Sequence, residues 1–186
     1  MLILRVYGEV LVCTNARLVH MNKSEQKQVL RDTLSEKRAS LSVAEAQRAS
    51  EDVCARLAAY LGEPRGKTIH AYSAKASWRE IDLLPYLEWL QDQHKEITID
   101  VATHMAVQAI PKQQYDIVLV PMLAFDGNLQ RLGMGMGWYD MFLSKQQHAL
   151  KIGIAYDWSE LENPITAEDH DVAMDVIVTP SRVITL

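Results

Sequence analysis

The chain has little of what several protein classes require. Its 186 residues include only two cysteines, Cys13 and Cys54, and this number and spacing suit neither a disulfide framework nor a zinc site. No apolar run is long enough to span a membrane, and the first residues lack the layout of a signal peptide. Sequence repeats and low-complexity linkers are absent too. We therefore expect a cytoplasmic protein with reduced thiols and no membrane partner.

An excess of charge of one sign is also missing. Lys and Arg number 19 and Asp and Glu number 24, which gives a formal charge of −5. Such a chain lacks the positive field that attracts nucleic acid. Hydrophobic residues make up 48% and charged residues 23% of the chain, which excludes disorder and coiled coil as the main structure. We predict one domain over residues 23–186, preceded by an extension or extra strand over residues 1–22, and we favour a monomer.

Hydrophobic patterns predict alternating helices and strands. A capping box at Ser42 and Glu45 marks the start of one helix, and Pro85 suits the first turn of another. The predicted helices cover residues 24–39, 43–61, 83–93 and 138–148, and the predicted strands cover residues 68–72, 97–101, 117–121, 152–155 and 176–179. The run at 117–121 is apolar throughout, which suggests a strand covered on both faces. This alternation predicts a layered α/β fold.

The densest chemical signal is a glycine-rich segment after the strand at 117–121. Gly133, Gly135 and Gly137 alternate directly before the helix predicted from Trp138. A glycine loop at a helix N-terminus can bind an anion through its backbone N–H groups, and Arg131 can add a bidentate phosphate contact. The segment matches neither the P-loop nor the Rossmann fingerprint, which would require glycine at position 138. The alternative is a structural turn whose glycines only permit tight packing.

Other charged residues are weaker candidates on their own. Asp140, one turn into that helix, could hold Mg²⁺, although by residue type a surface carboxylate that favours the helix dipole is commoner. Lys27 and Arg31 share one helix face and could receive a polyphosphate, or could form a solvated face. Residues 169–171 (Asp-His-Asp), with Asp175 beyond them, could supply a second metal carboxylate or simply be loop acids. The six histidines show no ligand spacing, which argues against zinc.

Taken together, these residues resemble the 5-formyltetrahydrofolate cyclo-ligase family, also called methenyltetrahydrofolate synthetases. The resemblance rests on Val120-Pro121, Phe125-Asp126, the run from Arg131 to Asp140, Lys27-Gln-Val-Leu-Arg31, Glu80 within Trp78-Arg-Glu-Ile-Asp82, Gly153-Ile-Ala155, and the stretch from Asp171 to Thr179. It extends over nearly the whole chain. It implies a three-layer α/β/α fold with a mostly parallel central sheet, similar to the sugar-phosphate isomerases.

The resemblance also implies a reaction. In this family 5-formyltetrahydrofolate and MgATP give 5,10-methenyltetrahydrofolate, ADP and phosphate, because the formyl oxygen takes the γ-phosphoryl group and N10 then closes the ring. The implied cofactors are ATP and Mg²⁺, and the implied partner is a reduced folate. The implied ATP site consists of Lys27, Arg31, Arg131, Leu132, Gly133, Met134, Gly135, Met136, Gly137, Trp138 and Tyr139, with Lys27 and Arg131 also catalytic. The implied folate contacts are Glu80, Met134, Trp138 and Tyr139, and the implied metal ligands are Asp140 and Asp171.

The chain departs from the family pattern at three places. Leu129 stands where glycine is usual, and Met141 stands where arginine often follows the Tyr-Asp pair. The segment over residues 97–115 is short, and its one proline is Pro111. It contains neither the Pro-Arg strand end nor the Gly-x-x-Glu-Pro stretch that the family often carries. These departures leave two alternatives open: a nucleotide- or folate-binding protein without turnover, and an ATP-dependent enzyme for another N-acylated heterocycle.

Overall fold

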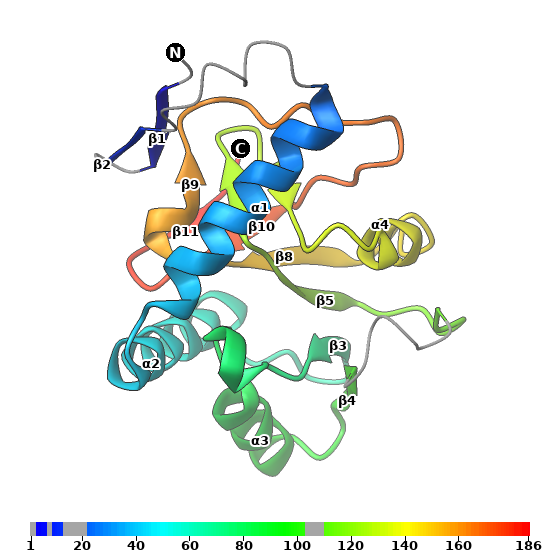
Figure 1. Cartoon of the computed structure of the whole chain (residues 1–186). Helices are drawn as coiled ribbons and strands as arrows, with labels where there is room; N and C mark the ends of the chain where they lie inside the picture. Colours follow the sequence, from blue (N-terminus) through cyan, green and yellow to red (C-terminus); the bar gives the residue numbers. More distant parts are fainter. Residues whose placement is uncertain (1–2, 7–8, 13–21, 103–109) are drawn as a thin grey trace.

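A six-stranded sheet forms the centre of the computed structural model, which describes residues 3–6, 9–12, 22–102 and 110–186 (Figure 1). The strand order is β11-β10-β8-β5-β3-β4, and all neighbours are parallel except β10 and β11. The strands are β3 (Thr68–Tyr72), β4 (Thr98–Ala102), β5 (Ile117–Pro121), β8 (Leu150–Ile154), β10 (Val176–Val178) and β11 (Val183–Ile184). The predicted mostly parallel sheet is therefore confirmed.

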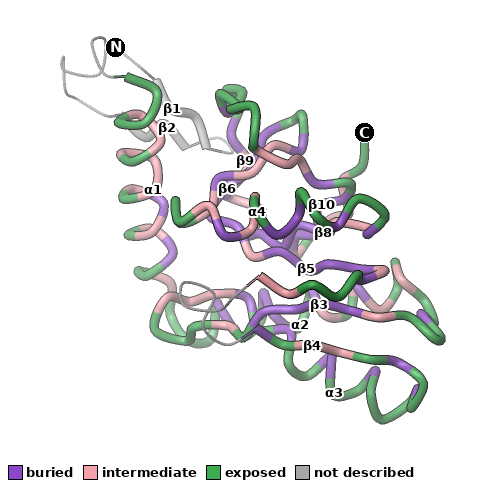
Figure 2. Tube along the Cα trace, turned by 90° about the vertical axis from the view of Figure 1, so that its right-hand side faces the viewer, coloured by how far each residue is buried: buried purple, intermediate pink, exposed green. Residues whose placement is uncertain are grey.

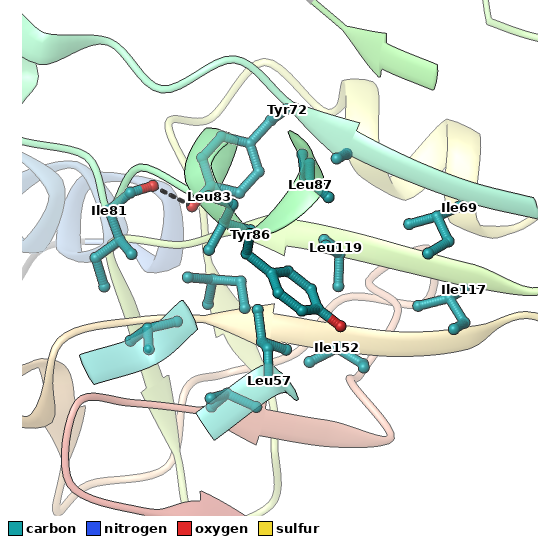
Figure 3. Packing of buried hydrophobic residues seen from close by; sticks show 14 of the residues in the cluster. Leu57, Ile69, Tyr72, Ile81, Leu83, Tyr86, Leu87, Ile117, Leu119 and Ile152 are labelled. Atoms are coloured by element: carbon teal, nitrogen blue, oxygen red, sulfur yellow. Dashed lines mark hydrogen bonds between the residues drawn. The ribbon is translucent and has the colours of Figure 1, made fainter. Parts of the chain in front are cut away.

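Helices cover both faces of this sheet. The strand β5 shows the division, because Ile117 and Leu119 pack in one core cluster and Val118 and Val120 pack in the other. The first cluster joins the sheet to α2 (Val43–Leu61) and α3 (Leu84–Gln93), and Figure 3 shows its packing. The second joins it to α4 (Trp138–Leu143). Figure 2 shows that β5 is buried along most of its length, as expected for the middle of three layers.

Local signals set the helix ends. Asn22 and Glu25 form a capping box at the start of α1 (Lys23–Ala39), and Ser42 and Glu45 form the predicted one at the start of α2. The predicted helices therefore begin within one residue of the observed ones. Gly62, with φ of 59°, ends α2 in a conformation that suits glycine.

The last predicted helix is wrong at its C-terminal end. We predicted helix over residues 138–148, whereas α4 ends at Leu143. The chain tightens there, since Lys145 N–H donates to the carbonyl of Phe142 at 3.0 Å. The buried Gln146 side chain instead accepts from the backbone N–H of Tyr115 at 3.0 Å. This contact with a distant loop, which the local sequence does not show, accompanies the early end of the helix.

A second, smaller sheet was not predicted. Its strand order is β2-β1-β9-β6-β7, and its strands are β1 (Ile3–Val6), β2 (Glu9–Val12), β6 (Ala124–Asp126), β7 (Arg131–Leu132) and β9 (Glu160–Leu161). Strands of two to four residues are too short to give a periodic pattern. The α1 residue Leu34 packs against Ala124, Leu132 and Leu161 of this sheet, which fixes α1 beside the glycine-rich segment. The division into residues 1–22 and 23–186 stays a prediction.

The structure bears on the predictions about membrane spans and thiols. Within the described ranges, no helix is long and apolar enough to cross a membrane. Cys54 is a free, half-buried thiol, and burial raises its pKa to about 11. Cys13 lies outside the described residues.

Candidate functional site

The candidate site is a cavity of about 360 Å³ at the carboxyl edge of the central sheet. Tyr72, Ala102 and Pro121, which end β3, β4 and β5, form part of its wall. Ligands of open α/β sheets bind outside the carboxyl ends of the strands, so the position is typical. The cavity is lined by every residue of the implied ATP, folate and metal sites: Lys27, Arg31, Glu80, Arg131, Leu132, Gly133, Met134, Gly135, Met136, Gly137, Trp138, Tyr139, Asp140 and Asp171. Asp175, another acidic candidate, pairs with Lys151 instead.

Several other lining residues were not predicted. They are Arg38, Tyr72, Ser73, Lys75, Trp78, Ala102, Pro121, Met122 and Leu123. The strand-end residues among them could have been found from the rule for parallel sheets. A second cavity of about 600 Å³ lies between α2 and α3, and Glu80 is the one predicted residue that lines both cavities.

The glycine-rich segment is bent around the side chain of Arg31. Gly135 has φ of 87° and Gly137 has φ of 65°, so both adopt the left-handed conformation that favours glycine. A Cβ atom at position 135 would lie 3.0 Å from Cζ of Arg31, whose Nε donates to the carbonyl of Gly133 at 3.0 Å. Position 135 therefore requires glycine for its backbone conformation and also for this close approach.

Two ion pairs join the cations of the cavity to the predicted metal ligands. Lys27 Nζ lies 3.0 Å from Asp171 Oδ2 and 2.9 Å from Glu168 Oε1, and Arg131 pairs with Asp140. Burial opposes the charge of Lys27, but the two carboxylates outweigh it and raise the pKa of Lys27. Burial also opposes the charge of Asp171, yet the N–H of Glu168 and the Lys27 ammonium lower the pKa of Asp171.

The carboxylates suit a magnesium ion that is bound together with phosphate. In the part of the chain that the structure describes, no group of three or more His, Cys, Asp or Glu side chains could hold a metal. Mg²⁺ commonly takes one or two protein carboxylates and completes its shell with water and phosphate oxygens. Asp140 and Asp171 line the same cavity and use one oxygen each for their pairs with Arg131 and Lys27. This donor set fits the ion, and the assignment stays a prediction.

Glu80, which also lines the cavity, is held in place by its own loop. Its Oε2 accepts from the backbone N–H of Lys75 at 2.8 Å. The carbonyls on either side of Glu80 are fixed as well, since Tyr72 OH donates to Ile81 O at 2.7 Å and Tyr156 OH donates to Arg79 O at 2.6 Å. The carboxylate is therefore presented on an ordered segment rather than on a free loop.

Aromatic side chains from α4 form the floor of the cavity. Trp138 is buried and its ring lies 5.9 Å from the ring of His70, nearly parallel to it. The hydroxyl of Tyr139 is buried and accepts or donates no hydrogen bond among the described residues. Burial raises the pKa of Tyr139 well above its ordinary value. An unpaired hydroxyl at a cavity wall is a natural contact for a polar ligand atom.

One departure from the family pattern has a structural consequence. Leu129, where the family usually has glycine, adopts φ of 56°, which is uncommon for a residue with a side chain. The side chain is fully buried in the cluster beneath α4, and this burial offsets the strain. Within the unusual segment 97–115, residues 103–109 lie outside the described ranges.

A parallel sheet with a glycine loop and several cations at its carboxyl edge is typical of α/β proteins that bind phosphate-containing ligands. Comparison with known proteins defines the family more narrowly. The model of the 5-formyltetrahydrofolate cyclo-ligase family matches residues 95–180. A relative from Mycoplasma pneumoniae named 5-formyltetrahydrofolate cyclo-ligase is 30% identical over 165 residues, which cover 82% of this chain and 97% of that protein. The chain belongs to the 5-formyltetrahydrofolate cyclo-ligase family.

Other relatives match over a shorter stretch. The Escherichia coli K12 protein of the same name is 38% identical over 76 residues, so the match spans 40% of this chain and only 41% of that relative. Two solved structures are similar over most of the fold. The methenyltetrahydrofolate synthetase of Mycoplasma pneumoniae has a TM-score of 0.68 and 25% identity, with 83% of this chain and 99% of that chain covered. That of Aquifex aeolicus has a TM-score of 0.68 and 26% identity, with 84% and 91% covered.

Proposed function

We propose that this protein converts 5-formyltetrahydrofolate and ATP to 5,10-methenyltetrahydrofolate, ADP and phosphate, with Mg²⁺ bound to the nucleotide. The main support is the single cavity that collects residues from α1, from the Glu80 segment and from the glycine-rich loop. These three segments are far apart in the sequence, and each contains part of the family motif. Family membership supports the same reaction.

In this proposal the phosphate chain lies along α1 and the glycine loop. Phosphoryl transfer depends mainly on positioning and on neutralising charge. Lys27, Arg31 and Arg131 would supply positive charge to the phosphates, and the backbone of the loop would supply N–H donors. Arg31 pairs with no carboxylate in the described ranges, so its guanidinium is available to a phosphate. Mg²⁺ held by Asp140 and Asp171 would offset further phosphate charge.

The folate lies at the other wall of the cavity in this proposal. The formyl oxygen attacks the γ-phosphorus and ADP leaves. N10 then attacks the formyl carbon, the phosphate departs with that oxygen, and N10 loses its proton. The protein has to align these atoms and exclude water, which would otherwise accept the phosphoryl group. Glu80 would accept hydrogen bonds from the pterin, with Met134, Trp138 and Tyr139 beside it.

The test is direct. The purified protein is mixed with 5-formyltetrahydrofolate and MgATP, and the methenyl product is followed by its near-ultraviolet absorbance. We expect product only when ATP and Mg²⁺ are both present, and none after chelation with EDTA. Glu80→Gln should raise the KM for the folate with little change in the KM for ATP. The matched control is Glu88→Gln, on the exposed face of α3, which should behave like the wild type.

A second candidate rests on the departure of residues 97–115 from the family pattern. That segment would alter the folate side and leave the phosphate side intact. Tight ATP binding without methenyl product would favour a binding protein or a different N-acylated heterocycle as substrate. The monomeric state and the cytoplasmic location stay predictions, to be tested by sedimentation and by cell fractionation.

A further inference from the structure

Arg38 is a buried cation that has no hydrogen-bond partner in the described part of the chain. It lies in the last turn of α1, is 4% exposed, and lines the cavity of the candidate site. Its ion partner is Glu80, but Nη2 of Arg38 and Oε1 of Glu80 are 3.7 Å apart. This distance is too long for a hydrogen bond. The Nε atom is also buried without an acceptor.

A guanidinium in this state requires an explanation. It has five N–H donors, and a buried donor without an acceptor is costly. The surroundings offer little compensation, since the nearby tyrosines Tyr72 and Tyr156 use their hydroxyls as donors to the carbonyls of Ile81 and Arg79. The pair of Arg38 and Glu80 is also a poor structural ion pair. Without a hydrogen bond between them, their attraction offsets little of the cost of removing both charges from water. A ligand that brings an acceptor into the cavity would satisfy these donors.

Glu80 defines what the rest of that ligand must offer. One carboxylate oxygen of Glu80 is held by the Lys75 N–H, so the carboxylate presents its remaining acceptor positions to the cavity. Arg38 presents donors directly beside it. A neighbouring acceptor and donor complement a cyclic amide, whose N–H and C=O groups are adjacent. The 2-amino-4-oxo edge of a reduced pterin has this pattern, with the amino group and N3–H as donors and O4 as acceptor.

The position along α1 agrees with this assignment. Arg31 and Arg38 are seven residues apart on one helix, a rise of about 10 Å. Arg31 lies at the glycine loop, where the phosphates are proposed, and Arg38 lies at Glu80. The two arginines therefore lie about 10 Å apart along the helix axis, one beside the proposed phosphate position and the other beside Glu80.

We propose that Arg38 determines specificity for the 4-oxo group of the pterin by donating a hydrogen bond to O4, while Glu80 accepts from N3–H and the 2-amino group. This inference rests on the proposed function. It assigns a direct substrate contact to a residue that looks, from its sequence position, like a basic side chain that merely favours the helix C-terminus.

The test uses two ligands that differ in the group at position 4; the 4-amino ligand also lacks the N3–H that faces Glu80, and because this loss is common to all variants, only the change in the affinity ratio between variants is read. The affinities of 5-formyltetrahydrofolate and of its 4-amino counterpart are measured by calorimetry for the wild type, Arg38→Met, Arg38→Lys and the surface control Arg48→Met. The wild type and the control should prefer the 4-oxo ligand. Arg38→Met should lower the ratio of the two affinities by about tenfold or more, because a hydrogen bond from a charged donor is lost. Arg38→Lys should restore part of the ratio, and MgATP affinity should stay unchanged in all four proteins.

Three outcomes overturn the inference. An equal loss of affinity for both ligands in Arg38→Met would mean that Arg38 acts only through the fold. A wild type that binds MgATP but neither pteridine would overturn the proposed function together with this inference, and it differs from the first outcome because the wild type itself fails. A ratio in Arg38→Met equal to that of the wild type overturns it too, and if Arg38→Met does not fold, Arg38→Leu, which also has no donor, takes its place with the same reading.

Discussion

Substitution of Gly135 by alanine tests the geometry of the glycine loop most sharply. Alanine at φ of 87° is strained, and the left-handed region costs an ordinary residue about 1–2 kcal/mol. The new methyl group would also lie 3.0 Å from Cζ of Arg31. If Arg31 moves away, its hydrogen bond to the carbonyl of Gly133 is lost, at about 1 kcal/mol.

Together, the backbone strain and the lost hydrogen bond should destabilise the nucleotide-binding conformation of the loop by about 2–3 kcal/mol. The dissociation constant for MgATP should rise roughly 30- to 150-fold, because each 1.4 kcal/mol is about a factor of ten. Calorimetric titration with MgATP measures this directly. The melting temperature should change less than this figure implies, since the exposed loop can relax to an unstrained conformation when no nucleotide is bound.

Two other glycines provide matched controls. Gly137 has φ of 65° but no heavy atom within 4 Å of an added Cβ, so Gly137→Ala should show the backbone strain alone. Gly127 has neither feature, so Gly127→Ala should bind MgATP like the wild type. In an Arg31→Ala background, the excess effect of Gly135→Ala over Gly137→Ala should disappear. Unchanged nucleotide affinity in Gly135→Ala would refute the assignment of this loop to the phosphates.

Three further predictions concern buried polar groups. Burial lowers the pKa of His70 to about 4, below its ordinary 6.5, so the unfolded chain binds more protons and the free energy of unfolding should fall by about 3 kcal/mol from pH 6.5 to pH 4. When the free energy of unfolding is measured by urea titration at each pH, it should fall less with decreasing pH in His70→Phe than in the wild type. An equal fall in both proteins would contradict this. Arg131→Ala leaves the Asp140 carboxylate unpaired and should cost about 3 kcal/mol in urea unfolding as well as MgATP affinity, whereas Arg131→Ala with Asp140→Asn should regain stability only. Asp126→Ala should cost about 2 kcal/mol or more in the same assay, because it removes the acceptor of the buried Ile165 N–H; a stability equal to that of the wild type would exclude this role.

Local sequence patterns were enough to predict most of the central helices and strands. Capping boxes, proline and glycine act within a few residues, so the starts of α2 and α3 and the end of α2 could be predicted from local patterns. The apolar run at β5 predicted a strand buried on both faces, because such a run is shielded from water when helices cover both faces of a parallel sheet. The motif from Arg131 to Asp140 resembles that of the 5-formyltetrahydrofolate cyclo-ligases closely enough that the family could be predicted from it.

The tertiary structure alone decided how those residues meet. Arg31 contacts a glycine 102 positions away, and Lys27 pairs with a carboxylate 144 positions away, and no local pattern records such distances. The two- to four-residue strands of the small sheet are likewise stabilised by their neighbours and not by their own sequence. Arg38 shows most clearly what local sequence does not record. Basic residues are common in the last turn of a helix, where they usually lie on the protein surface. Only the packing of α1 against the Glu80 segment buries Arg38, and burial turns an ordinary charge into a group that needs a ligand.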